Sequence, residues 1–170
     1  MIKILLVVVV VLASAGLGNV ISQNVFQRRK VLLSFIQGAK CMKNAMVYEQ
    51  QPLQHALFHC GGNEFFMRCA KISGKYPELL GGDLVKRALA EEKGNESTAV
   101  LKEEEKRELA AFVHGLSVAM LPEHIEEVCG RFLGEYGRAL REVNAVQLKR
   151  AKLIKSMCVL SGLALGIILI

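Results

Sequence analysis

The chain has 170 residues, of which 52% are hydrophobic and 22% are charged, and its formal net charge is +6. This length suits one domain with additional segments, and the hydrophobic share exceeds that of an ordinary soluble domain. The weak basic excess, 6% aromatic residues and absence of Trp argue against a nucleic-acid-binding protein, and the regularly spaced apolar residues argue against intrinsic disorder.

The first predicted element is the apolar segment Ile4–Ile21, which contains no charged residue. Its layout, with Lys3 before it and the small residues 13–15 inside it, is compatible with a signal peptide. The segment is also long enough to span a bilayer, and three basic residues, 28–30, follow it. This charge bias holds the following residues in the cytoplasm. We therefore favour an uncleaved transmembrane anchor, formed by residues 1–27, over a signal peptide.

Helical periodicity begins directly after the basic residues. Apolar residues recur from Leu32 to Met46 at spacings of three and four, which predicts one buried helix face. This helix should end near Tyr48–Gln51, because Pro52 disfavours helical geometry in the preceding residue and suits the first turn of a new helix. A short helix carrying Leu53, Ala56 and Leu57 and a third helix over 64–72, closed by Gly74, follow.

The second half of the middle region predicts three further helices. Asp83 is a candidate N-cap for a helix over 84–93, and the periodic stretch 101–119 carries acidic residues in its first turns. Pro122 should start the last helix, whose pattern continues through Lys149. No window alternates over the length of a strand, so the predicted class is all-α: an antiparallel bundle of about five to six helices over residues 28–155.

The last predicted element is a second transmembrane segment, residues 156–170, which carries no charge. Both predicted spans carry their positive flank on the side of the middle region, which agrees with a cytoplasmic bundle flanked by N- and C-terminal transmembrane helices. The candidate interfacial basic residues are Arg28, Arg29, Lys30, Lys149, Arg150, Lys152 and Lys155.

Small residues mark candidate helix-packing positions. Gly162 and Gly166 form a Gly-x-x-x-Gly pattern in the second span, and Ser14 with Gly18 offers a small face on the first, so the spans can pair within one chain or between chains. Glycines 130, 134 and 137 interrupt an otherwise good helix, which predicts a close crossing by a neighbouring helix.

One cluster resembles a metal site, because His55 and His59 lie four residues apart beside Cys60. The His-Glu-x-x-His pattern is missing and a third ligand would have to come from elsewhere, so we predict no metal. No Gly-rich or elbow motif surrounds any Cys and no phosphate-binding loop is present, so we also predict no catalytic residue and no cofactor. The five cysteines form no recognisable disulfide framework, and reduced, buried thiols are expected.

The stretch from Arg28 to Leu57, with its Tyr48-x-x-x-Pro52-Leu53 turn, resembles the stage III sporulation protein AB family of endospore-forming Firmicutes. The ending from Lys155 to Ile170 and the layout with an apolar segment at each end are also similar to that family.

This resemblance implies a non-enzymatic membrane platform related to the F-type domain of type II secretion systems. It would act in the channel complex between mother cell and forespore, in the mother-cell membrane around the forespore, with the helical domain in the cytoplasm. The implied partners are the other stage III sporulation A proteins, including a secretion-type ATPase, and self-association into a homo-oligomer is an open expectation. Two alternatives remain: a fragment of a type II or type IV pilus secretion platform, and an extracytoplasmic thiol or metal protein that uses His55, His59 and Cys60.

Overall fold

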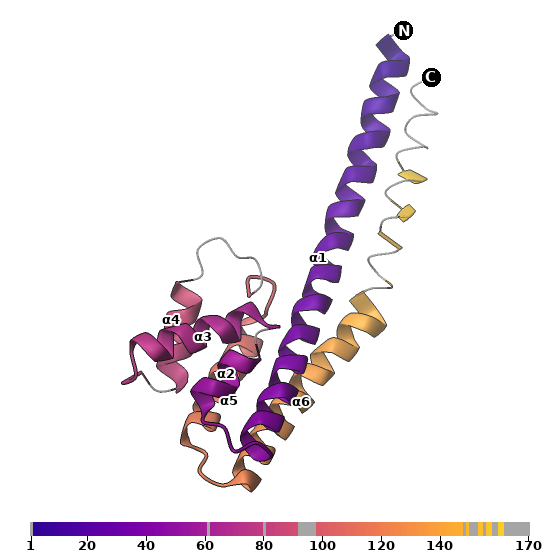
Figure 1. The fold of residues 1–170 in the computed structure, drawn as a ribbon. Coiled ribbons are helices and arrows are strands. Elements are labelled where there is room, and N and C mark those ends of the chain that lie inside the picture. Colours follow the sequence, from indigo (N-terminus) through magenta and orange to yellow (C-terminus); the bar gives the residue numbers. More distant parts are fainter. Residues whose placement is uncertain are drawn as a thin grey trace. The chain divides into compact units, whose positions relative to one another are not determined.

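The computed structural model describes residues 2–60, 62–79, 81–91 and 98–147, together with 149, 153, 154, 156, 157, 160 and 161; for residues 2–22, 146 and 147 it describes the backbone alone. Six α-helices and no strand occur in this part of the chain, which confirms the all-α prediction (Figure 1). The helices are α1 (Ile2–Val47), α2 (Leu53–His59), α3 (Glu64–Lys75), α4 (Gly81–Ala90), α5 (Glu103–Val118) and α6 (Pro122–Glu142), and a π-helical turn covers Val143–Gln147.

The chain divides into two compact units. The first consists of Met1–Arg29 and Arg141–Ile170, and the second is Lys30–Leu140. In the first unit, Arg29 Nε donates a hydrogen bond to Asn144 Oδ1 at 2.9 Å and so joins the two parts of the chain. Within the described residues, no helix combines the length and the hydropathy that a membrane crossing requires. Most of the predicted span 156–170 lies outside the described residues, as do the side chains of 2–22, so both spans stay predictions.

The second unit is a helical bundle in which α2 packs on α3, α3 on α4, and α4 on α5. Its part of α1 contributes the apolar face that the spacing predicts, and this face is buried: Leu32, Phe35, Ala39, Met42 and Met46. The helix ends at Val47, close to the predicted position, and α6 begins at Pro122 as predicted.

A continuous aromatic cluster forms the core of the second unit. The ring of Phe132 stacks on Phe112 and on Tyr136, with 4.1 Å between centroids in each pair. Phe35 meets Tyr136 and Phe66 edge to face, at 5.8 and 5.4 Å. Such arrangements add stability beyond the burial of apolar area, so α1, α3, α5 and α6 are held by one shared cluster.

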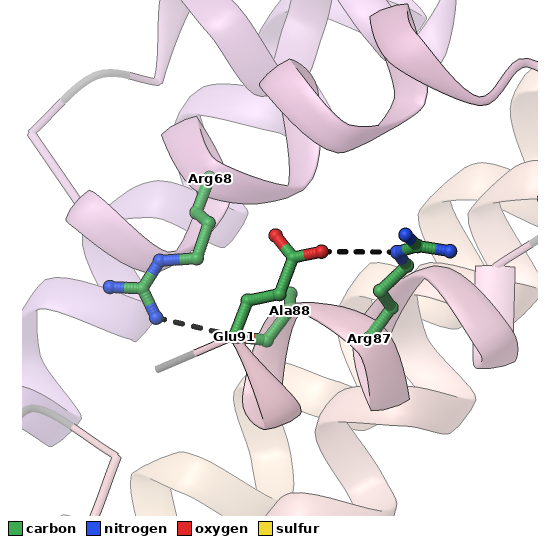
Figure 2. A network of polar contacts seen from close by, with 4 residues as sticks. All are labelled: Arg68, Arg87, Ala88 and Glu91. Atoms are coloured by element: carbon green, nitrogen blue, oxygen red, sulfur yellow. Dashed lines mark hydrogen bonds and ion pairs between the residues drawn. The ribbon is translucent and has the colours of Figure 1, made fainter. Parts of the chain in front are cut away.

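Polar contacts secure the helix ends of this unit. Asn63 caps α3, since its side-chain oxygen accepts hydrogen bonds from the backbone N–H groups of Phe65 and Phe66 at 3.0 and 3.2 Å. Figure 2 shows Arg68 of α3 donating to the carbonyl of Ala88 in the last turn of α4, at 3.3 Å. This bond joins α3 to α4 and satisfies a carbonyl at a helix C-terminus.

Three details of the sequence prediction are wrong. Helix α4 begins at Gly81, so Asp83 lies within the first turn and is not its N-cap. Helix α3 continues through Gly74 to Lys75, so Gly74 does not close it. A Cβ added at Gly130 or Gly134 would meet nothing within 4 Å, so no helix of the described chain crosses there.

Close approaches occur at other glycines. A Cβ at Gly38 would lie 2.6 Å from the Phe66 ring, and one at Gly81 would collide with the Cα of His114. Gly38 lets α1 approach the aromatic cluster, and Gly81 lets the start of α4 lie against the backbone of α5. Nothing in the sequence around Gly38 or Gly81 distinguishes these two glycines from the glycines that have no close neighbour.

Candidate functional site

The predicted basic flank is described only in part. Arg28 and Arg29 are half-buried and Lys30 is exposed on α1, and Lys149 is exposed in the first unit. Arg150, Lys152 and Lys155 lie outside the described residues. Arg29, one of the predicted interfacial cations, also donates the hydrogen bond to Asn144. This bond links the two parts of the chain that make up the first unit.

The predicted small-residue faces also lie largely outside the description. Ser14 and Gly18 fall within α1, where only the backbone is described, and Gly162 and Gly166 lie outside the described residues. Pairing of the two spans therefore stays a prediction.

The Tyr-x-x-x-Pro-Leu segment forms the tight turn between α1 and α2. Gln50 adopts the left-handed conformation, with φ of 53°, and the backbone N–H of Gln51 donates to the carbonyl of Ala45 at 3.0 Å. Pro52 precedes the first turn of α2, and its carbonyl accepts a hydrogen bond from the Ala56 N–H at 3.0 Å. The turn leaves the Tyr48 side chain 72% exposed.

A groove of about 550 Å³, here named the end groove, lies beside this turn. Residues 50–53 line one part of it, and residues from the stretch 116–122 line another, together with the buried side chains of Met46 and Ile125. The groove therefore joins the family-like turn to the connection between α5 and α6.

The exposed apolar connection between α5 and α6 is a candidate site feature that the sequence analysis missed. Val118, Met120 and Leu121 expose 56, 93 and 52% of their surfaces. The feature was missed because, in the sequence, apolar residues beside a proline look the same as a buried helix end. The signal that could have revealed it is the lack of polar residues in a connection between helices, since such connections usually face solvent.

The histidine and cysteine cluster does not form a complete metal site. His55 and His59 line a shallow groove with Phe58, and within the described residues no group of three His, Cys, Asp or Glu side chains is placed to hold a metal ion. Of the four described cysteines, Cys60, Cys69 and Cys129 are buried as expected, whereas Cys41 is exposed; Cys158 lies outside the described residues.

Burial raises the pKa of the three buried thiols. It raises the pKa of Cys69 to about 12 and that of Cys129 to about 11. Burial also raises the pKa of Cys60, and a hydrogen bond with Cys41 raises it further. Because the thiolate is the nucleophile and the metal ligand, these three thiols are poor in both roles at neutral pH.

Comparison with known families decides the identity of the chain. The model of the family "Stage III sporulation protein AB" matches residues 3–170. The chain belongs to the stage III sporulation protein AB family. This match confirms the resemblance drawn from the Tyr48-x-x-x-Pro52-Leu53 turn and the ending of the chain. The curated proteins and the solved structures contain no match to it.

Proposed function

We propose that this member of the stage III sporulation protein AB family is a non-enzymatic membrane platform of the mother cell–forespore channel complex. It couples a cytoplasmic secretion-type ATPase to the membrane assembly. Its partners are the other proteins of the stage III sporulation A complex. It resides in the mother-cell membrane around the forespore, with the helical second unit in the cytoplasm.

The observation that carries this proposal is the family match, which runs from residue 3 to residue 170 and so includes both apolar ends. Two features of the molecule support it. The ends of the chain belong to one compact unit, and Lys30–Leu140 forms a separate helical unit. The chain has a charge-free segment near each end and a folded helical unit between them. This layout suits a protein that presents a scaffold at a membrane surface.

Deletion of the gene in spore-forming cells tests the sporulation role. Cells without the chain should fail to complete sporulation, because the forespore loses its channel, and an intact copy of the gene should restore spores. Normal spore numbers in the deletion strain would contradict the proposal.

Thiol labelling in intact cells tests the membrane topology. The probe is a membrane-impermeant maleimide, applied to a chain whose native cysteines are replaced and whose exposed Lys71 is changed to Cys. Protection in whole cells and labelling after permeabilisation support a cytoplasmic second unit. Labelling in whole cells, with loss of the N-terminal segment, would instead favour an extracytoplasmic protein.

A further inference from the structure

Exposed apolar residues lie in and beside the end groove. Met120, which is 93% exposed, lines the groove, and three further exposed apolar residues lie in the two chain segments that border it: Tyr48, Val118 and Leu121. A single exposed apolar residue is ordinary, but a cluster beside a groove marks a surface that another molecule covers.

The charge around the end groove opposes the charge of the whole chain. The net charge is +6, yet neither 44–67 nor 108–130, the stretches that contain the groove, includes a Lys or Arg. Glu49 and Glu123 directly neighbour residues that line the groove. Lys43, just before the first stretch, is paired with Glu126 at 2.9 Å. The groove is therefore lined by apolar residues together with Gln50, Gln51 and Ser117, and acidic residues stand at its margin.

Helix ends add to this negative character. Helices α1 and α5 both end at the groove, and neither has a basic residue in its last turn. The other described α-helices each have one: His59, Lys75, Arg87 and Arg141. A helix C-terminus carries partial negative charge that a cation stabilises. The N-terminus of α6 lies at the same end and carries partial positive charge, which Glu123 in its first turn offsets.

A hydrogen-bond acceptor in the groove wall also lacks a partner. Gln51 Nε2 donates to Glu49 Oε2 at 2.8 Å, whereas the buried Gln51 Oε1 accepts no hydrogen bond. A buried acceptor without a hydrogen bond is unfavourable, and an N–H group of a bound segment reaches it only when the Gln51 side chain moves.

We propose that the end groove binds a basic amphipathic segment of a partner protein. The segment places a large apolar side chain in the groove, against Met120, and its Lys or Arg side chains meet Glu49, Glu123 and the ends of α1 and α5. The inference rests on the proposed scaffold role, since it names the surface through which that scaffold holds a partner and the chemistry of the segment held.

Photo-crosslinking of the full chain in sporulating cells tests this inference. A photoreactive phenylalanine analogue replaces Tyr48, and the matched control places it at Phe58, an exposed aromatic position of the same unit away from the end groove. The crosslinked peptides are mapped by mass spectrometry. We expect adducts at position 48, at least fivefold above position 58, on a partner segment that combines Lys or Arg with large apolar residues.

Charge variants of the crosslinking chain sharpen the test. Glu123→Lys should reduce the adduct at position 48 at least fivefold. Glu104→Lys, which reverses an exposed charge in the first turn of α5, at the opposite end of that helix, should leave it unchanged. Far-UV circular dichroism of each purified chain shows whether it is folded.

Several outcomes would overturn the inference: equal yields at positions 48 and 58, adducts on lipid, adducts on a second copy of this chain, or adducts on a segment without basic residues. Insensitivity of a folded Glu123→Lys chain would do the same. Failure of the platform role is read separately, from spore counts in the deletion strain, so the two failures are distinguishable.

Discussion

The aromatic cluster and the end groove are both apolar parts of the second unit, and they differ in what surrounds them. Phe35, Phe66, Phe112 and Phe132 expose at most 1% of their surfaces and touch one another, whereas Met120 exposes 93%. Apolar groups contribute to folding in proportion to the area they remove from water. The cluster therefore stabilises the fold, whereas the exposed surface of Met120 is free to contribute to association.

The largest expected effect tests the cluster. Phe132→Ala removes a ring that stacks on both Phe112 and Tyr136, so it should destabilise the chain by about 3–5 kcal/mol. Phe132→Asp should prevent folding of the second unit, because it buries a charge without a partner. Urea unfolding of the full chain in detergent micelles, followed by circular dichroism, measures both. A Phe132→Ala loss under 1 kcal/mol would show that the cluster is not the main source of stability.

The next largest effects on the free energy of unfolding are expected at two glycines, and they have opposite signs. Gly81→Ala should destabilise by roughly 1–3 kcal/mol, because the new methyl group meets the α5 backbone at His114. Gly130→Ala should stabilise by up to about 1 kcal/mol, because that position is an open helix surface. The same unfolding experiment compares them, and equal effects at both sites would refute the assigned packing.

The cap of α3 predicts a smaller loss. Asn63→Ala removes the acceptor for two backbone N–H groups and should cost about 0.5–2 kcal/mol. Asn63→Asp keeps a capping oxygen, although it loses the hydrogen bond that Asn63 Nδ2 donates to Ser34 Oγ at 3.1 Å. If the alanine and aspartate chains unfold at the same urea concentration, the cap does not contribute.

The smallest effect on folding is expected at the end groove. Met120→Asp should change stability by no more than about 0.5 kcal/mol, because the side chain is almost fully exposed. The same substitution should remove the adduct at position 48. A large loss of stability would mean that the Met120 side chain stabilises the fold, as the aromatic cluster does.

Much of the fold could be predicted because its signals are local. The spacing from Leu32 to Met46 identifies one buried face of α1, and Pro52 and Pro122 mark where new helices begin, since proline restricts the backbone whatever lies around it. The family resemblance was also readable in the sequence, because it depends on the order of motifs along the chain.

The candidate site was only half predictable. Tyr48, Pro52 and Leu53 stand out as a motif, but their partner in the groove, the connection at Met120, is about seventy residues away in the chain. Nothing local distinguishes an exposed apolar connection from a buried one. The glycines show the same limit, because Gly81 and Gly130 look alike in sequence and differ only in whether another helix lies beside them.

Residue spacing and local backbone restriction are enough to predict the helical class, the starts of the proline-led helices and the buried face of α1, and the order of motifs is enough to suggest the family. The packing of the helices is needed to show which aromatic rings stack, which glycines permit close packing, and that two helix ends without basic residues meet beside exposed apolar residues. Those features depend on contacts between segments far apart in the chain, and the side-chain pattern of one segment carries no information about what lies against it.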